Sequence, residues 1–141
     1  MSDGGKQPRG LRNNNPGNIR IGRTRYLGEI VPSSDREFRQ FSSMAWGYRA
    51  IFVLLDSYSR RGIDTIREIV SRYAPSNEND TRGYARFVCT LSGLGEDEPL
   101  DMGDRNTMVP VVAAISKMEN GVAADIDEVL AGWELFESHR P

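Results

Sequence analysis

The stretch "LRNNNPGNIR", residues 11–20, joins three consecutive asparagines to a Pro-Gly-Asn turn. Asn side chains bond to their own backbone, and Pro16-Gly17 marks a tight turn, so the stretch fits neither a helix nor a strand. Each Asn side chain carries both a hydrogen-bond donor and an acceptor. A stiff loop of amides has two uses: it connects its neighbours in the fold, or it binds a ligand rich in hydroxyl and amide groups, such as a sugar chain.

Downstream of this loop, residues 19–41 lack helical periodicity and contain Gly22, Gly28 and Pro32. We expect two short strands, at about 26–30 and 37–41, that form a small hairpin or meander. This β region therefore lies near the N-terminus, directly after the Asn loop.

The remainder of the chain predicts five helices. The first follows Ser42-Ser43 as N-cap, carries apolar residues at helical spacing from Met44 to Tyr58, and ends at Gly62. The second is expected to begin at Asp64 or Thr65 and to end before Pro75, and the third to begin at Asn79 or Asp80 and to end at Gly93. The fourth runs from about Asn106 to Asn120 with Pro110 in its first turn, and the fifth from about Asp125 to Phe136. The expected fold class is mostly α (α+β).

The chain has 141 residues, of which 38% are hydrophobic and 27% charged, as in one ordinary globular domain. We expect one domain over residues 9–141 and a disordered tail over residues 1–8. Residues 1–61 hold 11 basic and 5 acidic side chains, and residues 62–141 hold 7 and 15. An Arg-rich first half could bind an anionic polymer, either nucleic acid or cell wall. The alternative is that the basic and acidic halves attract each other within the fold. No Lys/Arg run is dense enough to predict nucleic acid as a partner.

Single cysteine and histidine residues limit the chemistry. Cys89 stands among apolar residues and is predicted to be a small buried side chain, and His139 is near the C-terminus and predicted to be solvated. A Cys-His or Ser-His mechanism and a zinc site are therefore not expected, and we predict no cofactor and no metal. No secretory signal is visible, and no stretch is long enough to span a bilayer.

Glu119 stands out in "VVAAISKMENG", residues 111–121, because it shares one helix face with Val112 and Ile115. Desolvation and the negative end of the helix dipole both disfavour its charged form. A Glu that stays protonated is what a general acid requires. The alternative is a Glu at the edge of the helix that extends to solvent.

Two groups of motifs resemble known families. "NNNPGNIR", "YLGE" and "FRQFSSMAWGYRAIFVLLDSYSRRG" resemble the bacterial cell-wall glucosaminidases, which are lysozyme-like enzymes. In that family the catalytic helix precedes the Asn loop, whereas here the similar run "AAISKMENG" follows it, as in a circularly permuted relative. Residues 9–121 also resemble a group of small phage proteins, some labelled virion proteins and some lysozyme-like or endolysin-like, that open with the motif "RGLRNNNPGNIR".

The resemblance implies a lysozyme-like domain that cleaves bacterial peptidoglycan as a muramidase, glucosaminidase or lytic transglycosylase. Glu119 would be the acid, and Glu29 would be the second catalytic group, with Asp35 and Glu37 next in order. The second group can also be absent where the substrate's own acetamido or 6-hydroxyl group completes the reaction. Asn13, Asn14, Asn15 and Asn18 would bind sugar or brace the catalytic helix, and Tyr26 would stack on a sugar face.

The alternatives are a virion structural protein that keeps the fold without activity, and a glycan-binding module. Expected partners are peptidoglycan strands and other virion proteins, with neither nucleic acid nor membrane insertion. The protein would reach the wall from the host cytoplasm through a holin or by export, or would be carried in the virion.

Overall fold

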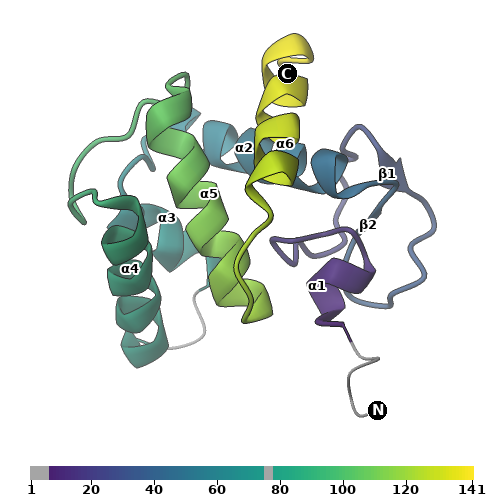
Figure 1. The fold of residues 1–141 in the computed structure, drawn as a ribbon, viewed down its shortest axis with the longest axis horizontal. Helices are drawn as coiled ribbons and strands as arrows, with labels where there is room; N and C mark the ends of the chain where they lie inside the picture. The colour runs from purple at the N-terminus through teal and green to yellow at the C-terminus, as the bar shows by residue number, and fades with distance from the viewer. Residues whose placement is uncertain (1–6, 75–77) are drawn as a thin grey trace.

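The computed structural model describes residues 7–74 and 78–141, and only the backbone of residues 78 and 79. The described chain forms six helices and a two-stranded sheet (Figure 1), which confirms the predicted mostly α, α+β class. The elements in chain order are α1 (Arg9–Arg12), β1 (Glu29–Ile30), β2 (Gln40–Phe41), α2 (Met44–Arg60), α3 (Ile66–Tyr73), α4 (Glu78–Ser92), α5 (Arg105–Asn120) and α6 (Ile126–Ser138).

The helices α2 and α6 pack closely across the centre of the molecule (Figure 1). Gly132 permits this approach, because a Cβ at that position would lie 2.5 Å from the Cβ of Tyr48. Three buried aromatic rings, those of Phe52, Trp133 and Phe136, pack beside the crossing with centroids 5.1–5.9 Å apart. The fully buried aromatic side chains therefore fix α6 on α2.

Helix α5 lies between the helical pair α3–α4 on one side and α1 with the strands on the other (Figure 1). Asp104 caps its start by accepting from the backbone of Asn106, and Gly121 ends it with a φ of 75°. Both bounds agree with the sequence-based prediction. Pro110, however, lies in the second turn rather than the first, because the helix begins at Arg105.

Local capping preferences correctly located three helix starts and misplaced one. Ser43 and Thr65, each one of two predicted candidates, cap α2 and α3, and Asp125, the predicted start of the last helix, is the N-cap of α6. The prediction that Asn79 or Asp80 caps α4 is wrong, because α4 already begins at Glu78. Pro75 and most of the predicted tail at residues 1–8 lie outside the described residues.

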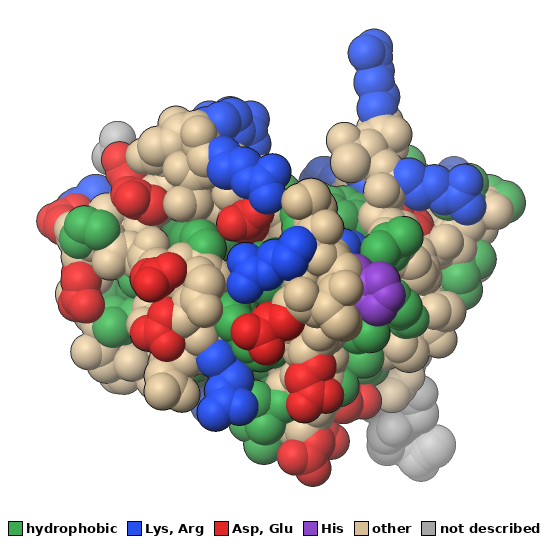
Figure 2. All heavy atoms as spheres, turned by 90° about the horizontal axis from the view of Figure 1, so that it is seen from above, with side chains coloured by type: hydrophobic (Ala, Val, Ile, Leu, Met, Phe, Trp, Pro, Cys, Tyr) green, Lys and Arg blue, Asp and Glu red, His purple; other side chains and the backbone are tan. Residues whose placement is uncertain are grey.

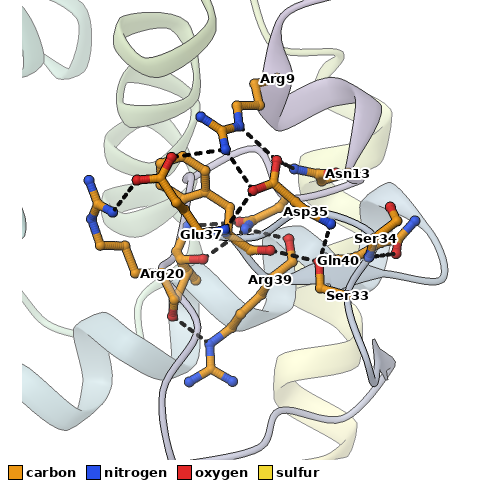
Figure 3. A network of polar contacts seen from close by, with 12 residues as sticks. Arg9, Asn13, Arg20, Ser33, Ser34, Asp35, Glu37, Arg39 and Gln40 are labelled. Atoms are coloured by element: carbon orange, nitrogen blue, oxygen red, sulfur yellow. Dashed lines mark hydrogen bonds and ion pairs between the residues drawn. The ribbon is translucent and has the colours of Figure 1, made fainter.

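The β region is smaller than predicted. Glu29 pairs with Phe41 and Ile30 with Gln40 in an antiparallel register, and one isolated bridge joins Arg20 to Phe38. Because the ladder is so short, side chains supply most of the connections here. Figure 3 shows them as a network of ion pairs and hydrogen bonds that joins α1 to the strand loops.

Candidate active site

Three of the four asparagines in the N-terminal loop brace the fold. Asn15 is fully buried; its Oδ1 accepts from the backbone of Ile19, and its Nδ2 donates to the carbonyls of Ile19 and Arg39. Asn13 donates to Asp35, and Asn14 donates to the carbonyl of Phe41. These amide hydrogen bonds therefore hold the loop to the β region, as the backbone hydrogen bonds of a longer strand ladder would.

The loop also needs backbone conformations that asparagine tolerates. Asn14 has a φ of 51° and Asn18 a φ of 49°, in the left-handed region where Asn is enriched. The turn at Asn18 directs its side chain toward the end of α5, away from the strands that Asn13 and Asn14 contact. This separates the role of Asn18 from that of the other three.

Glu119 lies in the last turn of α5 and is half-buried. Its Oε1 accepts a hydrogen bond from Asn18 Nδ2 at 2.9 Å, and its Oε2 accepts one from the Tyr84 hydroxyl at 3.0 Å. None of the ion pairs within the described ranges 7–74 and 78–141 includes Glu119. Lys117 points toward the ring of Phe87 instead. Neutral donors from the Asn loop and α4 therefore hold this carboxylate.

Asn120 fastens the same end of α5 to the loop. Its Nδ2 donates to the carbonyl of Pro16 at 2.8 Å and to that of Ser116 at 2.9 Å. Gly10 makes room for this contact, because a Cβ there would lie 2.5 Å from Asn120 Oδ1 and 2.9 Å from Asn18 Oδ1. The relative position of Asn18 and Glu119 is consequently fixed by packing on both sides.

The amide orientation of Asn18 follows from charge. Its Nδ2 faces Glu119, and its buried Oδ1 has no hydrogen-bond partner among the described residues. The reversed orientation would place two acceptor oxygens against each other. Glu119 therefore has a permanent donor on Oε1.

A cavity of about 390 Å³ lies beside Asn18, the partner of Glu119, but Glu119 itself is not among the residues that line it. Asn18 lines it together with aromatic side chains that include Tyr26 and Tyr58, and with Arg39 on the strand side. Aromatic rings and polar groups together suit a ligand with both apolar faces and hydroxyl groups. Of the predicted binding residues, Asn18 and Tyr26 line the cavity, whereas Asn13, Asn14 and Asn15 do not.

Two tyrosine hydroxyls next to the site stay protonated. Burial raises the pKa of Tyr84 far above its ordinary value, with the nearby Tyr73 and Glu119 adding to the effect. Burial likewise raises the pKa of Tyr73 well above its ordinary value, and its hydroxyl donates to the carbonyl of Gly17. Both residues therefore act as neutral hydrogen-bonding groups.

Glu29 does not share a cavity with Asn18 in the described structure. It lines a neighbouring cavity of about 330 Å³, and Arg39 lies between the two because it lines both. The Glu29 carboxylate accepts from Arg39 Nη1 at 2.6 Å, and each side chain of the pair is 5% exposed. The structure thus gives Glu29 a buried cationic partner, and its catalytic role stays a prediction.

Asp35 and Glu37, the next candidates for the second catalytic group, also form ion pairs with arginines. Arg9 donates twice to Asp35, at 2.7 and 2.8 Å, and once to Glu37 at 3.0 Å (Figure 3). The Arg9 guanidinium holds the pKa of the Asp35 carboxyl well below its usual range, and backbone hydrogen bonds add to the shift. Arg20 is a second partner of Glu37 at 3.4 Å. Asp35 and Glu37 therefore connect α1 to the strand loops.

The remaining predicted residues have ordinary environments. Cys89 is half-buried, and burial raises the pKa of its thiol. His139 is exposed, with its ring edge against Trp46. Sequence reasoning missed Asn120, although it is adjacent to Glu119 in the chain, and missed that the Tyr84 hydroxyl donates to Glu119. Within the described residues, no three His, Cys, Asp or Glu side chains are grouped to hold a metal ion.

Comparison with known proteins places the chain in a bacteriophage family. It is 36% identical over 131 residues to Protein P5 of Pseudoalteromonas phage PM2, and the match covers 89% of this chain and 80% of that protein. The chain belongs to the Protein P5 family. No protein-family model matches it. None of the helices in the described part of this family member is long and apolar enough to cross a membrane.

Proposed function

We propose that this phage-family protein is a peptidoglycan-degrading glycosidase in which Glu119 is the catalytic acid. The environment of Glu119 carries the proposal. A half-buried carboxylate at a helix C-terminus is held by Asn18 and Tyr84, which are both neutral, and Asn18 also lines the adjoining cavity. A carboxyl group without a cationic partner can exchange a proton with a substrate, as acid catalysis requires.

The two hydrogen bonds suggest which oxygen carries the proton. The Nδ2 group of Asn18 can only donate, so it favours an unprotonated Oε1. The Tyr84 hydroxyl can donate or accept, so it accepts from a protonated Oε2 and donates to the carboxylate after transfer. Glu119 would give this proton to the glycosidic oxygen as the bond from that oxygen to the sugar C1 breaks. The leaving sugar then departs as a neutral alcohol.

The paired state of Glu29, Asp35 and Glu37 favours a reaction with one carboxylate. The cationic sugar intermediate would be captured by water, by the substrate's acetamido oxygen, or by its own 6-hydroxyl group, with the proton returning to Glu119. The first outcome gives a muramidase or glucosaminidase product, and capture by the 6-hydroxyl gives the anhydro product of a lytic transglycosylase. The fold class and the resemblance to lysozyme-like glucosaminidases support this reading.

Clearing of purified Gram-negative peptidoglycan by wild type and by Glu119→Gln tests the proposal. We expect wild type to clear the suspension and Glu119→Gln to be slower by about 10²–10⁴-fold, because the amide cannot donate an acidic proton. Glu37→Gln is the matched control, since Glu37 is 53% exposed and should keep wild-type activity. Circular dichroism establishes that each variant is folded.

The outcome that contradicts the proposal is a folded wild type that clears none of several wall types. A virion structural protein or a glycan-binding module would then be the better interpretation, and a pull-down with insoluble wall separates them. If clearing occurs, mass spectrometry of the fragments distinguishes hydrolysis from anhydro products, which differ by one water.

A further inference from the structure

A third cavity, of about 440 Å³, is lined by a buried cation that forms no ion pair with any described carboxylate. Its walls come from the loop after the Asn turn, from α2 and from the end of α6; the lining residues that matter here are Thr24, Arg25, Tyr26, Arg49, His139 and Arg140. Figure 2 shows Lys and Arg side chains on both sides of the histidine at this end of the molecule. No Asp or Glu lines the cavity.

Arg49 is the centre of this site. It is 4% exposed, and burial lowers the pKa of its guanidinium from the ordinary value. Its Nη2 donates to the carbonyl of His139, while its buried Nε has no hydrogen-bond partner among the described residues. None of the ion pairs in the described parts of the chain includes Arg49, although Pro141 lines the same cavity.

A buried charge without a counter-ion is costly, so its place in a cavity indicates a ligand that supplies the counter-ion. The planar guanidinium fork matches a carboxylate in two parallel hydrogen bonds. Arg25 and Arg140 are exposed at the rim and add positive charge, which attracts an anion toward Arg49.

The position of this cavity relates it to the cleft beside Asn18. Thr24 and Tyr26 line both cavities and so form the wall between them. A glycan strand in the first cavity would carry its peptide substituents past this wall. Those peptides end in carboxylates, which are the groups that a buried Arg recognises best.

We propose that the cavity around Arg49 is a carboxylate-binding subsite for the peptide stems attached to the glycan. The inference rests on the proposed function, because it takes the glycan to lie in the cavity lined by Asn18. The subsite would make the protein prefer wall that carries free peptide carboxylates over bare or amidated glycan.

Binding of a soluble muropeptide to the Glu119→Gln variant tests the subsite without cleavage of the ligand. We expect the free-acid muropeptide to bind about tenfold or more tightly than the same compound with its carboxylates amidated. Arg49→Gln, added to Glu119→Gln, should remove this preference, and Arg140→Gln should reduce it, with circular dichroism checking the fold because Arg140 stacks on the ring of Phe136. Arg36→Gln, at an exposed position outside the cavity, is the charge-matched control.

Equal affinity for the acid and amide forms, no binding of the acid form, or an unchanged preference in a folded Arg49→Gln would overturn the subsite. If Arg49→Gln fails to fold, Arg140→Gln decides the result. The two proposals can fail separately. Wall clearing without a preference for the free-acid muropeptide would support the proposed glycosidase and contradict the subsite. A preference for the free-acid muropeptide without any clearing of peptidoglycan would support the anion site and contradict the proposed glycosidase.

Discussion

The end of α5 and the strand side of the molecule hold their carboxylates in opposite ways. At the end of α5, Glu119 accepts from the neutral groups of Asn18 and Tyr84. On the strand side, Glu29 and Asp35 each face a guanidinium. The Arg9 guanidinium lowers the pKa of Asp35, and Arg39 forms a buried ion pair with Glu29. The difference separates carboxylates that ion pairs hold in place from one that neutral hydrogen-bond donors hold in place.

The strongest test of this comparison is Arg39→Met. Arg39 pairs with Glu29 at 2.6 Å and donates to the carbonyl of Arg20 at 2.9 Å. Its loss leaves a buried carboxylate without a partner, so we expect the free energy of unfolding to fall by about 3–5 kcal/mol in urea titrations. The double variant with Glu29→Gln should recover part of that loss. An unchanged midpoint in the single variant would contradict the assigned role of the pair.

The Asn loop joins the two regions, and Asn15→Ala tests that connection. The substitution leaves the Ile19 N–H and the Arg39 carbonyl without the Asn15 side chain, while the Ile19 carbonyl keeps the backbone N–H of Arg39. We expect a loss of about 2–4 kcal/mol of unfolding free energy. Asn13→Ala, which removes one bond to Asp35, is the control and should cost about 1 kcal/mol. Equal losses in the two variants would show that burial of Asn15 is not the cause.

Acid titration tests the ionic character of the strand side. The folded pKa of Asp35 lies below its unfolded value of about 3.9, so its contribution to stability is complete above that pH and is lost as pH falls toward the folded pKa. We expect the melting temperature of wild type to drop below about pH 4. The Asp35→Asn variant should begin with a lower melting temperature and show a flatter acid limb. Parallel limbs in the two proteins would contradict the pairing with Arg9.

The smallest stability effect is expected at the end of α5. Tyr84→Phe removes one hydrogen bond to a half-exposed carboxylate and should cost about 1 kcal/mol in unfolding free energy. Wall clearing should nevertheless fall about tenfold, because the hydroxyl that exchanges roles with Oε2 is lost. Tyr58→Phe, which keeps the aromatic ring that lines the cavity, is the control. A large stability loss with unchanged clearing would assign Tyr84 to the fold instead.

Sequence patterns predicted the helices better than the site. The residues Ser43, Thr65 and Gly121 set helix ends through local preferences that the sequence states directly. The start of α4 was misplaced because "SNEND" offers several neighbouring polar residues that suit an N-cap equally.

The environment of Glu119 could be predicted only in part. Helical periodicity placed it on the apolar face of α5, but its partners Asn18 and Tyr84 are 101 and 35 residues away in the chain. Contacts between distant side chains leave no local pattern. For the same reason the sequence left the Asn loop between bracing and binding; in the structure Asn15 braces the fold, while Asn18 contacts Glu119 and lines a cavity.

The contact between Asn18 and Glu119 also sets the order in which the protein becomes complete during synthesis. A nascent chain that has reached residue 110 contains the Asn loop and the strands but not Glu119. The contacts from Asn18 to Glu119 and from Asn120 to Pro16 span 101 and 104 residues, so they are formed after most of the chain has left the ribosome. A chain that stops before Glu119 therefore lacks the contacts that hold the end of α5 against the Asn loop, although it already contains every residue that lines the cavity beside Asn18.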